Sequence, residues 1–180
     1  IYSGLSNADA VSNGVVIVNR SYGWGCQGAS ETYGSGSASY DNYVRVNPTF
    51  MITHSAGNAG SGTCYANGAG WGNITGITKM AKNIFDVGSS GDNGTLTGFS
   101  SRGPARDGRI LPHIVAPGPG GTSHASPNLG GIFGQLNQAY SFHNGGVIPH
   151  SGLLKAVLLN TADDMLNPGP DFKTGFGHVN

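Results

Sequence analysis

Short apolar runs alternate along the chain with segments of helical periodicity. Residues 15–18 read Val-Val-Ile-Val, a pattern typical of a strand buried on both faces. Residues 50–53 read Phe-Met-Ile-Thr and predict a second strand of the same kind. Shorter apolar runs at 84–87 and 114–115 predict two more strands.

Helical segments are expected between and after these runs. A short helix is predicted at 40–46, before Pro48. A long helix is predicted at 122–140, because apolar residues there recur on one face: Ala125, Leu129, Ile132, Phe133, Leu136 and Tyr140. Three glycines inside it, at 130, 131 and 134, predict close packing against neighbouring backbone. A further helix is expected from Ser151, a good N-cap, to about Leu158.

This alternation predicts an α/β fold with a mainly parallel sheet flanked by helices. The chain contains no repeat and no linker, so residues 1–180 are interpreted as one domain or part of one.

Composition narrows the functional classes. Charged residues make up 10% of the chain, and nine basic residues balance nine acidic ones. This argues against electrostatic binding of nucleic acid and against a basic membrane-binding surface. No run of apolar residues is long enough to predict a membrane span. Glycine occupies 32 of 180 positions without a Gly-X-Y period, which indicates a turn-rich domain and excludes collagen.

The candidate chemistry centres on residues 121–127, which read Gly-Thr-Ser-His-Ala-Ser-Pro. A turn of small residues places Ser123 in the first turn of the predicted long helix, where unpaired N–H groups and the helix dipole favour negative charge. A serine there can act as a nucleophile whose own N–H helps to hold an oxyanion. Pro127 lacks an N–H, so it cannot bond the Ser123 carbonyl four residues earlier. An ordinary capped helix start is the alternative interpretation.

Several motifs together resemble the subtilisin-like serine proteases, the subtilases. Residues 121–127 resemble the family's nucleophile segment, although His124 stands where methionine is usual. Residues 55–58, Ser-Ala-Gly-Asn, resemble the segment that carries the oxyanion-hole asparagine. The segments 99–104 and 114–118 resemble the block that leads to the nucleophile. The resemblance extends from about Val15 to Asn180 and implies a three-layer subtilisin-like fold.

The resemblance also implies roles for individual residues. Ser123 matches the nucleophile, and Asn58 matches the side-chain donor to the oxyanion. The primary specificity pocket is expected between two walls, the first formed by Ser21, Tyr22 and Gly23 and the second by Ser55, Ala56 and Gly57. The alternatives are a turn asparagine at 58 and ordinary turns after the two strands.

Cys26 and Cys64 each follow one of these strand ends. A disulfide between them would join two substrate-facing loops, but two free thiols are an equal alternative from sequence.

Two members of the family's catalytic triad are missing. A serine hydrolase needs a base and a group that orients the base, and subtilases carry them in Asp-Ser/Thr-Gly and His-Gly-Thr segments upstream of the serine. Neither segment occurs here. Structural or solvated roles are expected for the six histidines, and His124 is too close to Ser123 in sequence to act as its base.

The chain therefore resembles the second half of a subtilase catalytic domain. Only Pro119 and Gly120 join two motifs between which the family has a strand, and the chain begins at Ile1 without methionine. Two explanations are open: segments missing from this sequence supply the rest of the catalytic domain, or the chain is a shortened inactive relative.

The leading hypothesis is a secreted endopeptidase that acts on proteins or peptides and whose partner is the rest of its own catalytic domain. A pseudoprotease or binding module is the second hypothesis. A Gly/Asn-rich extracellular β-solenoid is the third, and the predicted helices argue against it. The chemistry requires no cofactor and no catalytic metal. Structural calcium is left open, with the expected turn at 89–93 as a weak candidate.

Overall fold

The computed structural model describes residues 6–23, 32–64 and 68–180. Four strands form one parallel sheet in the order β1 (Ile17–Arg20), β2 (Met51–Ser55), β3 (Phe85–Ser90) and β4 (Ile114–Pro117). Val18 pairs with Ile52, Thr53 with Phe85 and Val87 with Ile114. The predicted parallel α/β fold is confirmed.

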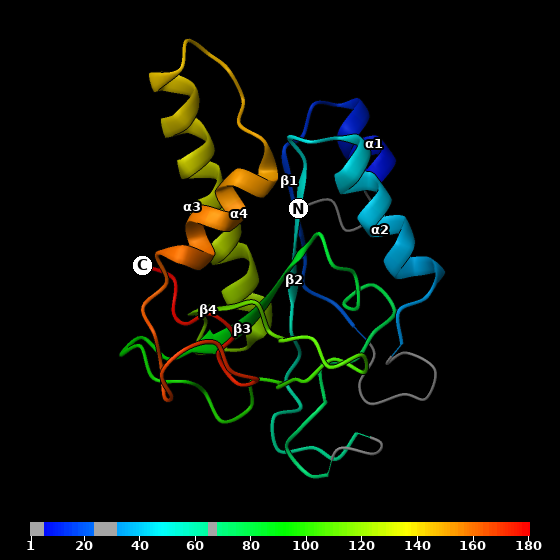
Figure 1. The fold of residues 1–180 in the computed structure, drawn as a ribbon, viewed down its shortest axis with the longest axis vertical. Coiled ribbons are helices and arrows are strands. Elements are labelled where there is room, and N and C mark those ends of the chain that lie inside the picture. The colour runs from blue at the N-terminus through cyan, green and yellow to red at the C-terminus, as the bar shows by residue number, and fades with distance from the viewer. Residues whose placement is uncertain (1–5, 24–31, 65–67) are drawn as a thin grey trace.

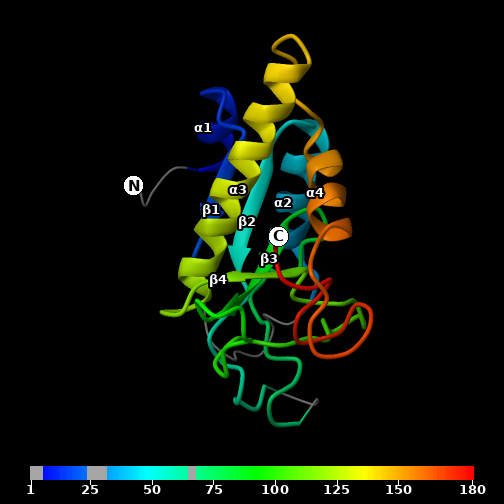
Figure 2. The same ribbon diagram turned by 90° about the vertical axis from the view of Figure 1, so that its left-hand side faces the viewer.

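In the described ranges, four helices accompany the sheet: α1 (Asn7–Ser12), α2 (Ser35–Val46), α3 (Thr122–His143) and α4 (Ser151–Asn160). Figure 2 shows the sheet between α3 on one side and α2 on the other. Figure 1 shows the long α3 running beside the strands, with its N-terminal end near β3 and β4. This is the three-layer arrangement that the sequence predicts.

The two faces of the sheet bury different core clusters, because neighbouring strand residues point to opposite sides. Met51 packs with Leu129 and Phe133 of α3, and Leu154 and Leu158 of α4 join that cluster. Ile52 belongs to the second cluster, which includes Ala10 of α1 and Val44 of α2. The sheet is therefore covered on both faces, as a parallel sheet requires.

The four predicted strands are present, but their bounds and burial differ from those expected. β2 and β3 are buried throughout, but β1 lies at the edge of the sheet and is only partly buried. The expectation that residues 15–18 are buried on both faces is therefore wrong. β3 runs through Ser90, so the turn expected at 89–93 begins only at Gly91.

The glycines of α3 also depart from expectation. A Cβ added at Gly131 or Gly134 would meet nothing within 4 Å. At Gly130 it would lie 3.6 Å from Thr53 Oγ1 and 3.7 Å from Ile17 Cδ1, which is ordinary contact with side chains. The expected packing of these glycines against neighbouring backbone is wrong.

Candidate active site

Three segments far apart in sequence meet beyond the carboxyl ends of β1 and β2. Residues that follow each strand lie against the start of α3, the usual position of a site in an open parallel sheet. They enclose a cavity of about 270 Å³. It is lined by Tyr22, Gly23, Ser55, Gly57, Asn58, Ala59, Asn73, Thr75, Lys79, Ser101, Thr122 and Ser123.

Ser123 is half-buried in the first turn of α3. The helix follows Gly121, whose φ of 145° is a conformation that favours glycine. The N–H groups of His124 and Ala125 both bond to the Gly121 carbonyl, at 2.9 and 3.3 Å. The N–H of Ser123 has no hydrogen-bond partner among the described residues. It is one of the unpaired donors expected at a helix start.

Asn58 is held by the residue that precedes Ser123. The Thr122 N–H and hydroxyl both donate to Asn58 Oδ1, at 3.0 and 2.9 Å. The Thr122 hydroxyl also accepts the Gly57 N–H at 3.1 Å. Because a backbone N–H can only donate, the amide oxygen of Asn58 must face Thr122. The Asn58 Nδ2 group is thus left as a donor, and Asn58 lines the same cavity as Ser123.

The carbonyl freed by Pro127 has a different partner. Ser21, just beyond β1, donates its hydroxyl to the Ser123 carbonyl oxygen at 3.0 Å. Asn19 and Ser21 also bond through their side chains, at 2.9 Å. The end of β1 is therefore tied directly to the candidate nucleophile.

The predicted pocket walls are largely brought together. Tyr22, Gly23, Ser55 and Gly57 line the cavity with Asn58 and Ser123. Ser21 contacts Ser123 from beside the cavity. Ala56 is fully buried and contributes its carbonyl rather than its side chain.

Lys79 also lines the cavity, and the sequence analysis did not identify it as a site residue. Its side chain is buried, and Nζ donates to the Ala56 carbonyl at 3.3 Å. Burial lowers the pKa of Lys79, and the negative charge of Asp86 opposes part of that effect. The sequence did contain an indication of a special role for Lys79, because no Asp, Glu, Lys or Arg occurs between Arg45 and Lys79. A single lysine in so uncharged a stretch was a candidate for a specific role.

A second buried titratable side chain lies in β3. Asp86 is fully buried, and neither carboxyl oxygen has a hydrogen-bond partner among the described residues. Burial raises the pKa of Asp86, while Lys79 and Lys155 lower it. Lys155 of α4 is half-buried, and desolvation lowers its pKa to about 8.

Three buried or half-buried histidines have hydrogen-bond partners other than Ser123. His54 is fully buried; its Nδ1 lies 3.2 Å from the Ser55 carbonyl and its Nε2 lies 3.1 Å from the Thr78 hydroxyl. His113 Nδ1 accepts the Asp86 N–H at 2.9 Å, and His178 Nε2 pairs with the Ser90 hydroxyl at 3.0 Å. His124 is exposed, and its ring lies against Gly120. None of the residues that line the Ser123 cavity in the described chain is histidine.

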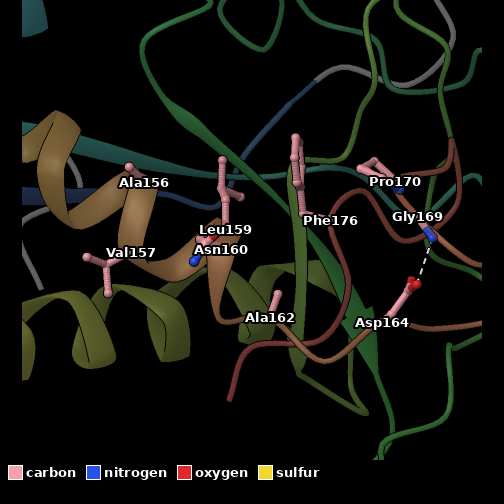
Figure 3. Close-up of a pocket in the computed structure, with 9 residues that line it drawn as sticks. All are labelled: Ala156, Val157, Leu159, Asn160, Ala162, Asp164, Gly169, Pro170 and Phe176. Atoms are coloured by element: carbon pink, nitrogen blue, oxygen red, sulfur yellow. Dashed lines mark hydrogen bonds between the residues drawn. The ribbon is translucent and has the colours of Figure 1, made fainter.

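A larger hollow, of about 640 Å³, lies elsewhere, between α4 and the loop that follows it. Figure 3 shows Val157 and Leu159 of α4 with Pro170 and Phe176 from the C-terminal segment. The Asp164 carboxylate caps the Gly169 N–H at 2.7 Å. None of the residues that line this larger hollow also lines the Ser123 cavity. The larger of the two hollows is therefore not the one that contains the candidate nucleophile.

Three further expectations concern metal, membrane and cysteines. Within the described ranges, no three His, Cys, Asp or Glu side chains lie close enough together to hold a metal ion. No helix in those ranges has the length and apolar character to cross a membrane. Cys64 is disulfide-bonded, and the chain's other cysteine, Cys26, lies outside the described residues.

Comparison with known proteins shows the family to which this chain belongs. The model of the subtilase family, Peptidase S8, matches residues 4–177, so the chain belongs to this family. A curated relative is the uncharacterized protein aq_aa18 of Aquifex aeolicus (strain VF5). It is 34% identical over 84 residues, which cover 47% of this chain and 34% of that protein.

Solved structures show the same fold at low sequence identity. A lanthipeptide protease matches with a TM-score of 0.75 at 20% identity, over 96% of this chain and 61% of that one. The prenylagaramide maturation protease PagA matches with a TM-score of 0.73 at 23% identity, over 98% and 66%. The PatG macrocyclase, solved in complex with a peptide, matches with a TM-score of 0.72 at 20% identity, over 97% and 52%. The chain thus spans about three fifths of the first of these structures.

Proposed function

We propose that this chain carries the nucleophile and oxyanion hole of a serine endopeptidase. Ser123 Oγ attacks the carbonyl carbon of the scissile bond and forms an acyl-enzyme, and water later releases the acyl group. The Asp and His of the triad come from a segment of the protein outside this sequence. The relation between Asn58 and Thr122 carries the proposal, because it sets an amide donor beside a serine at a helix start.

The oxyanion hole has two donors in this proposal. The unpaired N–H of Ser123 is one, and the Nδ2 group of Asn58 is the other. Neither has to be reoriented when negative charge develops on the substrate oxygen, which is the property that makes such donors effective. Removing one side-chain donor of this kind typically costs about 10²–10³ in kcat.

The substrate is proposed to be a peptide or protein whose chain lies along the ends of β1 and β2. The cavity beside Ser123 accepts one side chain, between the Tyr22–Gly23 wall and the Ser55–Gly57 wall. The PatG macrocyclase, which has the same fold, was solved in complex with a peptide, which supports this substrate class. The disulfide at Cys64 supports a secreted protein, because disulfides persist in oxidising compartments.

A fluorophosphonate probe tests the assignment in the full-length protein. We expect the probe to label Ser123, and Ser123→Ala to abolish both labelling and peptide hydrolysis. Ser126→Ala is the matched control, because Ser126 lies one turn later and bonds Asn19 at 2.7 Å rather than facing the cavity. Labelling that persists in Ser123→Ala would refute the assignment.

The alternative is an inactive subtilase-like pseudoprotease or binding module. The absence of a histidine from the described lining of the cavity favours it. It predicts peptide binding without probe labelling or turnover, so the same experiment separates the two functions.

A further inference from the structure

The ammonium group of Lys79 lies between the two walls of the candidate pocket. A Cβ added at Gly23 would lie 2.7 Å from Lys79 Nζ, and a Cβ added at Gly57 would lie 3.4 Å from it. The ammonium therefore occupies the space that a side chain from either wall would need. Lys79 is the only cationic side chain in the described lining of the cavity.

This ammonium group is buried without a full set of partners. Lys79 is 4% exposed, and its single hydrogen bond to the described residues goes to the Ala56 carbonyl. An ammonium has three donors, so two remain available. Lys79 forms no ion pair within the described chain, and the buried Asp86 leaves both of its oxygens without hydrogen bonds. A buried charge in this condition is costly unless a ligand completes its partners.

The rest of the cavity is small and uncharged. Its remaining polar side chains include those of Ser55, Asn73, Thr75 and Ser101. Its volume of about 270 Å³ exceeds the roughly 150 Å³ that holds a benzene molecule in an engineered protein cavity. One amino-acid side chain therefore fits. An apolar side chain would cover the ammonium without pairing it, whereas a carboxylate would accept its free donors.

We propose that Lys79 selects substrates that carry an acidic side chain on the residue whose carbonyl Ser123 attacks. This inference rests on the proposed function, because it assigns a substrate class to the same site. The carboxylate of a glutamate or aspartate accepts hydrogen bonds from Nζ. Such charge-assisted bonds are shorter and stronger than neutral ones. The neutral isostere glutamine would leave the ammonium without a counter-charge.

The test compares two fluorogenic peptides that differ only in glutamate or glutamine before the scissile bond, with both termini capped. With the full-length protein, we expect kcat/KM to be at least tenfold higher for the glutamate peptide. Lys79→Met should remove this preference, and Lys79→Arg should keep part of it because the cation remains. Far-UV circular dichroism checks that each variant folds. Equal kcat/KM for both peptides in the wild type, or a preference that survives in Lys79→Met, would overturn the proposal.

A binding measurement separates this proposal from the proposed function. The same two peptides are titrated against Ser123→Ala and against Ser123→Ala/Lys79→Met by fluorescence anisotropy. At least tenfold tighter binding of the glutamate peptide, lost in the double variant, supports the role of Lys79 even if the wild type hydrolyses neither peptide. Equal binding of the two peptides refutes that role even if hydrolysis and Ser123 labelling are observed.

Discussion

Thr122 fixes the orientation of Asn58 by donating two hydrogen bonds to the same side-chain oxygen. The backbone N–H lies 3.0 Å from Asn58 Oδ1 and the hydroxyl lies 2.9 Å from it. The residue before the candidate nucleophile thus also aligns the candidate oxyanion donor. In the proposed mechanism, one turn of chain therefore positions both the attacking serine and the donor to the oxyanion.

Substitution of Thr122 should therefore lower kcat with little change in KM. Thr122→Val removes the hydroxyl and keeps the side-chain shape, and the backbone hydrogen bond still holds Asn58 in part. We expect a loss of about tenfold in kcat, smaller than the roughly 10²–10³-fold loss expected for Asn58→Ala. Steady-state kinetics on a peptide substrate measures both parameters. Thr122→Ser keeps the hydroxyl and is the control, and a Thr122→Val enzyme with wild-type kcat would contradict this role.

The bond from Ser21 to the Ser123 carbonyl should contribute to stability because Pro127 leaves that carbonyl without a helical donor. Ser21→Ala should lower the free energy of unfolding by about 1 kcal/mol, the usual contribution of one such hydrogen bond. Pro127→Ala restores an N–H, so Ser21→Ala should cost less in that background. Urea unfolding of the four proteins gives the coupling energy. An equal cost of Ser21→Ala in both backgrounds would show that the two residues act independently.

The parts of the fold that the sequence predicted are those with strong local patterns. The apolar runs placed all four strands, and the periodic face placed α3. Helix α1 was missed because six residues carry too little periodicity, although its capping box of Ser6 and Asp9 is a recognisable signal. Helix α2 begins at Ser35, earlier than expected, and Ser37 in its first turn hydrogen-bonds the Ile77 carbonyl, a tertiary contact that no local pattern predicts.

The site was predicted where motifs lie close to a strand end or a helix start. Ser123, Asn58 and four of the wall residues line one cavity, as this logic expects, and their catalytic and binding roles stay predictions. Lys79 was missed because it reaches the cavity from a segment without helical or strand periodicity. Its importance depends on burial between Gly23 and Gly57, which only the folded backbone creates.

Burial of His54 should make the protein less stable in acid. Desolvation, aided by the charge of Lys79, lowers the pKa of His54 from 6.5 to about 3. The unfolded chain therefore takes up a proton below about pH 6.5, while the folded chain stays neutral at His54 down to about pH 3. The free energy of unfolding should fall across this range, by up to about 5 kcal/mol from this group at 1.36 kcal/mol per pH unit.

The contribution of His54 can be isolated by substitution. His113, whose pKa burial also lowers, acts in the same direction. Burial raises the pKa of Asp86, so this group acts in the opposite direction. Its contribution to the free energy of unfolding falls as pH rises above about 4. Urea unfolding between pH 4 and 7 measures the free energy of unfolding of the wild type and of His54→Gln. We expect the difference between these two free energies to shrink as pH falls. A difference independent of pH would contradict the assignment.

Two glycines at the site helix should respond in opposite ways to alanine. Gly134 lies inside α3 with open space around it, so Gly134→Ala should raise the free energy of unfolding by about 0.5–1 kcal/mol. Gly121 has a φ of 145°, and a Cβ there would lie 3.3 Å from Asn58 Nδ2. Gly121→Ala should therefore lower stability by about 1–3 kcal/mol and lower kcat by displacing the oxyanion donor. Thermal unfolding and peptide kinetics measure both effects, and a Gly121→Ala protein as stable and active as the wild type would show that this backbone conformation is not required.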